Sequence, residues 1–313
     1  MLTVFSLCLC NFFSLSILYS RGDFMPYFKI GDIVARKSYN YDVLFKIQRI
    51  NGDMADLVGI SVRILADAPI YDLRLITDTE AKRILSDIEK NSRTRLSRSY
   101  SGITNRFNIR NSYFANRDTP SYIYSKDEIF KKPGVVLHID GDPEYALKCK
   151  DMYKKMGIIA HVYNIKEQEQ PKHIYSLLTR IRPNILVLTG HDAFIRKKND
   201  IYNIDNYKNS RYFIESVLEA RRYEHSLDNL VIFAGACQSY YEAIISAGAN
   251  FASAPKRVLI DMLDPIIVAQ TVAYTPVDKF APLASIISNT REGLKGIGGV
   301  QTRGQYREGM PGI

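Results

Sequence analysis

The stretch that decides the fold is NLVIFAGACQSYYEAII, residues 229–245. An uncharged apolar run ends on Gly235 and Ala236, Cys237 follows, and residues 238–245 have the composition of a helix. A continuous apolar run is typical of a strand that is buried on both faces of a parallel sheet. The cysteine after it either packs as a small hydrophobic side chain or serves as a nucleophile, and the rest of the chain must decide between the two.

The same order of strand and helix is repeated from residue 133 onward. Apolar runs occur at 134–140 (GVVLHID), 158–163 and 184–190 (NILVLTG). The segments between and after the strands predict helices over 143–156, 172–181, 210–222 and 238–247. Strands that alternate with helices predict right-handed βαβ units. We therefore expect residues 133–313 to form an α/β domain with a doubly wound, mostly parallel sheet.

The part of the chain before residue 133 follows other patterns. Residues 25–80 contain short β-type runs, such as DIVARKS and VLFKIQRI, separated by turn residues at roughly ten-residue spacing. This pattern predicts a small SH3-like β-barrel, a fold that binds partners and seldom carries chemistry. Residues 81–132 predict a short amphipathic helix, ending near residue 90, and then an irregular, arginine-rich linker.

The first 20 residues are mostly apolar, like the core of a signal peptide. No Lys or Arg precedes the apolar run, and no small-residue cleavage site follows it. We expect residues 1–24 to be a disordered N-terminal extension or the product of a misassigned start site. A true signal or anchor segment is the alternative.

Composition narrows the class of protein. A chain of 313 residues suits one large domain and one small one. Four cysteines at these spacings predict neither a disulfide framework nor a zinc site, so we expect a reducing, intracellular compartment. The net charge of +9 is compatible with nucleic acid or with an acidic partner. Because no nucleic-acid-binding motif accompanies the charge, nucleic acid is not expected as a partner.

Polar side chains follow three of the predicted strands. Asp140 and Asp142 end the first, His191 and Asp192 end the second, and Cys237 ends the third. Because parallel strands place their carboxyl ends at one edge of a sheet, we expect these residues to lie close together. A cysteine nucleophile needs a base beside it, and a helix N-terminus further favours the thiolate. The sequence therefore predicts a His/Cys pair at this edge.

Each member of this set also has an ordinary structural interpretation. Cys237 alone could be a buried packing residue, and His191 alone could be a hydrogen-bonded core residue. Asp192 either orients the imidazole or has a helix-capping or surface role. Gly235 and Ala236 are small enough for a substrate carbonyl to approach the backbone amides there.

These motifs resemble those of known peptidases. An apolar strand followed by Gly-His, and a later strand followed by Ala-Cys-Gln, are similar to the caspase-type cysteine peptidases, which include gingipains and clostripain. KIGDIVARKSY, VLHIDGD, LTGHDA, VIFAGACQS and AGANFASAP more specifically resemble the sporulation-specific YabG peptidases, over nearly everything from residue 25 onward. One departure concerns the oxyanion hole. In caspase-type peptidases a Gly normally follows the His and donates an amide, whereas here Gly190 precedes His191 and Asp192 follows it.

The resemblance implies a cysteine endopeptidase with a caspase-like α/β domain. Its substrates would be spore-coat and related proteins, in the cytoplasm of the mother cell of a sporulating bacterium. Cys237 would attack the scissile carbonyl, and His191 would protonate the leaving amine. Gly190, Asp192 and Ala236 would line the substrate site. No metal, organic cofactor, nucleic acid or membrane is implied.

The resemblance also predicts cleavage after arginine. Arg-specific relatives place an acidic residue at the end of the first strand, which makes Asp140 or Asp142 the specificity residue, with Asp140 favoured. A carboxylate can pair with guanidinium through two parallel hydrogen bonds. The alternative is that the DGD sequence only forms a turn and a helix cap.

Arginine specificity would make the linker a substrate of the enzyme itself. We expect self-cleavage after one of Arg93, Arg95, Arg98, Arg106 or Arg110. Two other functions are compatible with the sequence. One is a non-catalytic scaffold for coat assembly, and the other is a Cys-dependent amidase with a flavodoxin-like fold.

Overall fold

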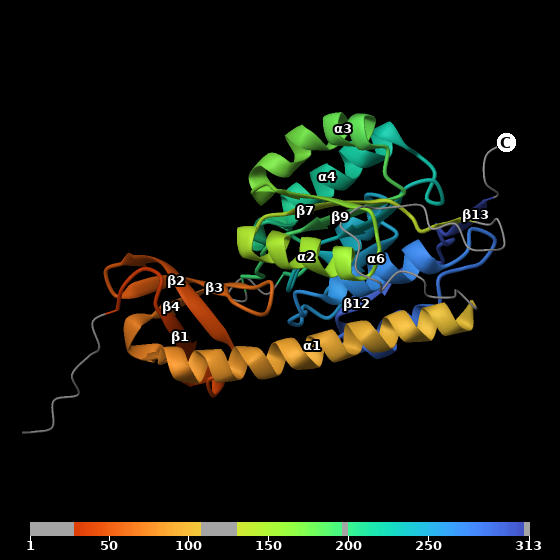
Figure 1. Ribbon diagram of the computed structural model, residues 1–313. Coiled ribbons are helices and arrows are strands. Elements are labelled where there is room, and N and C mark those ends of the chain that lie inside the picture. Colours follow the sequence, from red (N-terminus) through yellow and green to blue (C-terminus); the bar gives the residue numbers. More distant parts are fainter. Residues whose placement is uncertain (1–27, 108–129, 196–199, 310–313) are drawn as a thin grey trace, which may run out of the picture.

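The computed structural model describes residues 28–107, 130–195 and 200–309 (Figure 1). Two sheets dominate these residues, an antiparallel one near the N-terminus and a mostly parallel one in the C-terminal half. A third, two-stranded sheet pairs β6 (Phe130–Lys132) with β13 (Arg307–Gly309). The N-terminal extension predicted for residues 1–24, and Arg110, lie outside the described residues.

The N-terminal sheet has five antiparallel strands in the order β4-β3-β2-β1-β5. They are β1 (Ile33–Arg36), β2 (Leu44–Asn51), β3 (Met54–Gly59), β4 (Leu65–Pro69) and β5 (Leu73–Leu75), with short 3₁₀ turns at Lys37–Tyr39 and Ile70–Asp72. Within residues 28–107 no ladder joins β4 to β5, so closure into the predicted SH3-like barrel is not seen. The strand β4 was not expected, because Leu65–Pro69 has little β-branched character.

The arginine-rich segment after this sheet is a helix, which contradicts the prediction of an irregular linker from residue 91. Helix α1 runs from Asp78 to Arg106, and Thr77 caps it by accepting a hydrogen bond from the Glu80 amide. Figure 1 shows α1 passing from the N-terminal sheet along the C-terminal domain. Leu96, Tyr100 and Ile103 lie one helical turn apart and are buried in the core of that domain.

The C-terminal sheet has six strands in the order β12-β11-β10-β9-β7-β8. They are β7 (Val136–Asp140), β8 (Ala160–Asn164), β9 (Ile185–Thr189), β10 (Val231–Ala234), β11 (Phe251–Ser253) and β12 (Ile297–Gly299). Every pair of neighbours is parallel except β11 and β12. The predicted doubly wound, mostly parallel α/β sheet is confirmed.

Helices cover both faces of this sheet (Figure 1). They are α2 (Pro143–Lys155), α3 (Gln170–Ile181), α4 (Ser210–Tyr223), α5 (Tyr241–Ser246), α6 (Asp264–Tyr274) and α7 (Leu283–Asn289), with short 3₁₀ turns at Glu167–Glu169, Ile204–Asn206 and Gly293–Lys295. None of the described helices has both the length and the apolar composition needed to cross a membrane.

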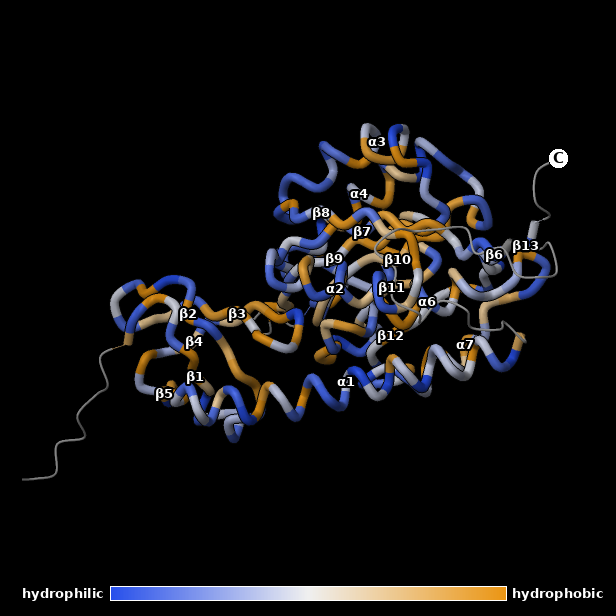
Figure 2. The backbone as a smooth tube through the Cα atoms, in the orientation of Figure 1, coloured by the Kyte–Doolittle hydropathy of each residue, from blue (hydrophilic) through white to orange (hydrophobic). Residues whose placement is uncertain are grey.

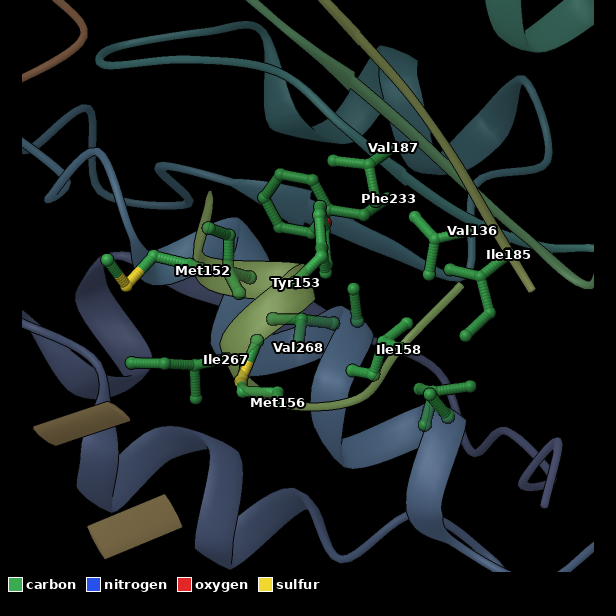
Figure 3. Close-up of a cluster of buried hydrophobic side chains, with 14 of the residues drawn as sticks. Val136, Met152, Tyr153, Met156, Ile158, Ile185, Val187, Phe233, Ile267 and Val268 are labelled. Carbon is green, nitrogen blue, oxygen red and sulfur yellow. The ribbon is translucent and has the colours of Figure 1, made fainter. Parts of the chain in front are cut away.

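Alternate residues of the central strands enter two separate cores. On β10, Val231 and Phe233 pack with α2 and α6, whereas Ile232 and Ala234 pack with α3 and α4. Figure 3 shows the first core around Phe233 and Tyr153, and Figure 2 shows the hydrophobic colouring gathered along the central strands. Because both faces of each strand are buried, the strands are continuous apolar runs in the sequence.

The two large sheets meet through the loop between β3 and β4. Val62 and Ile64 from this loop share one buried cluster with Ala193, Cys237 and Ile260 of the C-terminal domain. Val62 also forms an antiparallel bridge with Asp261. The N-terminal sheet therefore contacts the edge of the parallel sheet where the polar strand ends lie.

Candidate active site

Three neighbouring strands bring the predicted residues to one edge of the sheet. Asp140 is the last residue of β7, His191 follows β9 by two residues, and Cys237 follows β10 by three. The strands are adjacent in the order β10-β9-β7 and all parallel. Their carboxyl ends therefore meet, as expected for a site in an open α/β sheet.

Cys237 lies in a turn that precedes helix α5 by several residues. The helix begins at Tyr241 and not at Gln238, so the predicted contact of the thiol with a helix N-terminus is wrong. The Sγ atom is fully buried, accepts a hydrogen bond from the Ile260 amide at 3.2 Å and lies 3.6 Å from the Ile260 carbonyl oxygen. Burial raises the pKa of the Cys237 thiol to about 12, so the thiol is protonated in this state.

His191 is held between two acceptors. Its Nε2 lies 3.4 Å from the carbonyl oxygen of Gly59, and its Nδ1 lies 3.9 Å from Oδ2 of Asp142. The ring also packs on Tyr145, with 5.3 Å between ring centroids. Burial lowers the pKa of His191, and the nearby Asp142 carboxylate only partly opposes this effect. Burial therefore favours the neutral form of the imidazole.

Asp192 does not orient the imidazole, in contrast to one of its predicted roles. Its carboxylate is buried and accepts hydrogen bonds from the amides of Ala193 and Asn209 and from the hydroxyls of Ser210 and Ser239. These bonds tie the loop after β9 to the start of α4 and to the turn that carries Cys237. The carboxylate nearest the imidazole is that of Asp142.

The two candidate specificity residues have different partners. Asp142 caps α2 by accepting a hydrogen bond from the Tyr145 amide at 2.9 Å, which is the structural alternative considered for it. Asp140 is fully buried, and its Oδ2 lies 2.8 Å from Nη1 of Arg63, which is itself fully buried. Burial alone would raise the pKa of Asp140, but the Arg63 guanidinium, the His138 imidazole and the Asp142 amide together outweigh that effect and hold the pKa below its usual range.

Arg63 comes from the loop between β3 and β4 and was not anticipated as part of the site. Its carbonyl oxygen accepts hydrogen bonds from the Cys237 amide at 3.1 Å and from the Asp192 amide at 3.3 Å. The second donor is the residue directly after His191, at the position where caspase-type peptidases normally have a glycine. The signal in the sequence was a single arginine within the otherwise uncharged run 57–65.

Glu167 was also missed. Its carboxylate is mostly buried and accepts a hydrogen bond from the His191 amide at 2.7 Å. A Cβ atom at Gly190 or at Gly141 would overlap this carboxylate, so both glycines make room for it. Burial raises the pKa of Glu167 to about 7. Gly190 thus acts on the position of His191 through Glu167.

Two serine side chains hold the backbone of Ala236 by hydrogen bonds. Its amide donates to the Ser239 hydroxyl at 2.9 Å, and its carbonyl accepts from the Ser253 hydroxyl at 2.8 Å. Because Ala236 directly precedes Cys237, these bonds also fix the direction of the Cys237 amide. Ala236 contributes to the site by positioning its neighbour.

Comparison with known proteins assigns the chain to a family. The model of the YabG peptidase U57 family matches residues 29–311. The chain belongs to the YabG peptidase family. The chain is 39% identical over 294 residues to the sporulation-specific protease YabG of Bacillus subtilis (strain 168), which covers 91% of this chain and 98% of that relative. The comparison with solved structures gave no match. Family membership confirms the predicted resemblance and shows that the chain is a peptidase.

One cluster at this edge has side chains of the type that bind metals. Ligand atoms of His138, Asp140 and Cys149 lie within 4.8 Å of one another. The guanidinium of Arg63 already pairs with Asp140 and lies 4.0 Å from Sγ of Cys149. Two of the three side chains in this cluster therefore already contact the Arg63 guanidinium.

Proposed function

We propose that this member of the YabG peptidase family is a cysteine endopeptidase that cleaves after arginine. Cys237 is the nucleophile, His191 the base and acid, and Asp140 the specificity residue. Because its relative from Bacillus subtilis is a sporulation-specific protease, we place its action in sporulation, on spore-coat and related proteins in the mother cell.

One observation carries this proposal, namely the pose of Arg63. Its carbonyl oxygen receives two amides, one of them from Cys237 itself. Two amides that converge on a carbonyl oxygen are the arrangement that stabilises the oxyanion of acyl transfer, and one such donor is worth about 3 kcal/mol in the transition state. The residue whose carbonyl lies there is the residue before the bond to be cut.

The proposed catalytic steps follow from this pose. His191 accepts the thiol proton, the Cys237 sulfur adds to the carbonyl carbon, and the amides of Cys237 and Asp192 stabilise the negative oxygen. His191 then donates the proton to the leaving amine, and water hydrolyses the thioester. Asp142, 3.9 Å from Nδ1, favours the imidazolium that forms between these steps.

The side-chain pocket supports the specificity for arginine. Nη1 of Arg63 pairs with Asp140, Nη2 lies 3.1 Å from the Met262 carbonyl oxygen, and the Tyr145 ring centroid lies 4.9 Å from the guanidinium carbon. The contacts differ from the expected pair of parallel bonds to one carboxylate, since Nη1 forms an ion pair with Asp140, Nη2 donates to the Met262 carbonyl oxygen, and Nε has no hydrogen-bond partner among the described residues. A lysine ammonium has neither the planar shape nor the spread of donors to replace them.

The proposal is tested with fluorogenic peptides that differ only in Arg, Lys or Asp before the labelled bond. We expect cleavage of the Arg peptide, with Cys237→Ala and His191→Ala each reducing the rate to background. His161→Ala is the matched control and should retain most of the activity, because the His161 side chain is exposed on β8 and has no assigned role in binding or bond cleavage. Equal rates for the Arg and Lys peptides would remove Asp140 from the specificity pocket.

A thiol-reactive probe separates this proposal from its two alternatives. The peptidase is labelled at Cys237 and also cleaves protein. A Cys-dependent amidase would be labelled without proteolysis, and a scaffold would show neither labelling at Cys237 nor proteolysis.

A further inference from the structure

The loop that joins β3 to β4 lies across the site as a short extended strand. Val62 forms an antiparallel bridge with Asp261, and Ile64 forms a parallel bridge with Asp192. The Met262 amide donates to the Ser61 carbonyl oxygen at 3.3 Å, and the Leu65 amide donates to the Asp192 carbonyl oxygen at 3.0 Å. The residues on both sides of Arg63 are therefore paired with backbone from the two walls of the site. This main-chain pairing is how extended peptides are commonly bound.

The contacts of Arg63 exceed what a loop between two strands requires. A hairpin loop normally keeps a charged side chain in water, and burying a guanidinium is costly unless a partner charge and hydrogen bonds compensate. Here Asp140 and the Met262 carbonyl meet the guanidinium, and both belong to the peptidase domain. Main chain and side chain thus occupy the positions that the proposed function assigns to a substrate.

We propose that residues 59–64 are an inhibitory segment bound as a substrate, and that self-cleavage of the Arg63–Ile64 bond opens the active site. This inference rests on the proposed function. It is an alternative to the self-cleavage predicted for the linker: the bonds after Arg93, Arg95 and Arg98 lie inside helix α1, Arg106 is the last residue of that helix, and Arg110 lies outside the described residues.

The reaction at this bond is ordinary peptide hydrolysis. The Cys237 sulfur bonds to the Arg63 carbonyl carbon, the thiol proton passes through His191 to the Ile64 nitrogen, and the carbon–nitrogen bond breaks. Water then adds its hydroxyl to the Arg63 carbonyl carbon, and its other proton restores the thiol. The products are a carboxylate on Arg63 and an amine on Ile64.

The new chain ends explain why the cut opens the site. Ile64 is almost fully buried in an apolar cluster with Val62, Ala193 and Ile260. An ammonium group on Ile64 and a carboxylate on Arg63 are both charged at neutral pH, and burying them there is unfavourable. The ends therefore move to solvent, and Arg63 leaves the pocket.

The two fragments stay together after the cut. Strands β3 and β4 remain paired from Met54 with Pro69 to Val58 with Leu65, and β5 remains paired with β1. Only residues 59–64 are released from the site. A cut in the linker would instead separate the two domains. Native mass spectrometry should therefore find one intact complex after cleavage at Arg63–Ile64 and two separate fragments after cleavage in the linker.

The state of the two catalytic groups agrees with an inhibited enzyme. The inhibitory segment covers them, since Cys237 packs in one cluster with Val62 and Ile64 and the His191 imidazole lies against Gly59. Burial raises the pKa of the Cys237 thiol and lowers the pKa of His191. Withdrawal of the segment admits water and removes part of the cause of both shifts.

The test follows the full-length protein from first purification by N-terminal sequencing, denaturing and native mass spectrometry, and hydrolysis of the Arg peptide. We expect a new N-terminus Ile64-Leu65-Ala66, two fragments under denaturing conditions, and an unchanged native mass. The fraction cut and the rate of peptide hydrolysis should rise together. Cys237→Ala should stay intact, and Arg49→Gln, which changes an exposed arginine of the same sheet, should be cut like the wild type.

Two variants separate inhibition from cleavage. Ile64→Pro keeps Arg63 in the pocket but replaces the amide of the bond to be cut, so it should remain uncut and inactive. Arg63→Gln removes the side chain that fills the pocket, so it should remain uncut at this bond yet hydrolyse the Arg peptide without a lag. If both variants matched the wild type in cutting and in lag, the inference would be wrong.

The outcomes also distinguish failure of this inference from failure of the proposed function. Cys237-dependent hydrolysis of the Arg peptide without a lag, by a protein that stays intact at Arg63–Ile64, would overturn only the inhibitory segment. If the wild type, Arg63→Gln and protein already cut at this bond all failed to cleave any Arg peptide in a Cys237-dependent way, that result would overturn both the inhibitory segment and the proposed function.

Discussion

The buried pair of Arg63 and Asp140 allows a quantitative prediction of how firmly the loop is held. The side chains are both 0% exposed and lie 2.8 Å apart. Coulomb's law gives about 6 kcal/mol for this separation at an effective dielectric constant of about 20. Desolvation offsets much of that attraction, but removing one partner leaves an uncompensated charge and costs about 3–5 kcal/mol.

A double-mutant cycle measures this interaction. Arg63→Gln, Asp140→Asn and the double variant are made in the Cys237→Ala background, so that self-cleavage cannot change the fold. Urea unfolding should show each single variant destabilised by about 3–5 kcal/mol. The double variant should be destabilised by at least about 2 kcal/mol less than the sum of the two singles, because the second change removes the orphaned charge.

Arg49 and Asp56 form a matched control pair. Their side chains lie 3.0 Å apart but are 69% and 37% exposed, so their coupling should be at most about 1 kcal/mol. A coupling between Arg63 and Asp140 no larger than that of the control would refute the reasoning. The peptidase domain would then not recognise arginine through Asp140.

Three further predictions concern the rest of the site and the long helix. Burial raises the pKa of Glu167 and the pKa of Asp264 to about 7 each, above their unfolded values of about 4.3 and 3.9. Each carboxyl therefore stabilises the folded state fully below its unfolded pKa, and this stabilisation is lost as the pH rises through 7. Glu167→Gln should remove one of these two contributions, and an unchanged pH-dependence of the free energy of urea unfolding would contradict the assignment. Gly190→Ala introduces a Cβ atom that overlaps the Glu167 carboxylate, so kcat for the Arg peptide should fall at least about tenfold while the near-ultraviolet circular dichroism spectrum stays native. Gly102→Ala is the control, because a Cβ atom at Gly102 on α1 meets no other atom. Leu96→Ala should destabilise the protein by about 2–5 kcal/mol in thermal or urea unfolding, and a change below about 0.5 kcal/mol would mean that α1 does not pack as described.

Much of the α/β domain could be predicted because its strands are buried on both faces. The runs around Val187 and Phe233 are apolar without interruption, the run around Val136 is broken only by His138, and their order along the chain sets the parallel topology. The same topology placed Asp140, His191 and Cys237 at one edge. What the pattern could not provide was the choice between Asp140 and Asp142, since both are compatible with a strand end.

The long helix was missed because some of its buried positions are polar. Ser92 and Ser99 are buried as firmly as Leu96, and Ser92 donates a hydrogen bond to the Asp261 carboxylate. Small hydroxyl residues let helices approach closely, yet they add nothing to an apolar periodicity. A search for amphipathic spacing therefore lost the signal after residue 90.

Arg63 was missed for a different reason. A charged residue between two β-type runs is normally a solvated turn residue, and its burial depends on a carboxylate that lies on another domain. Only tertiary contact between the loop and the peptidase domain brings the two together. No local rule in the sequence could predict that contact.

The extended backbone of the loop also indicates which arginines in other proteins the enzyme could cleave after. Val62 and Ile64 occupy the site as strand residues, paired on both sides, and helical backbone cannot form such pairs. The arginines of α1 lie in the same molecule as the active site but are held in a helix. If the proposed specificity holds, a target protein should be cut where an arginine lies in a segment that is already extended or that unfolds locally. Cleavage rates would then follow the free energy of that local opening, so that two identical arginine-containing sequences could differ greatly in lifetime.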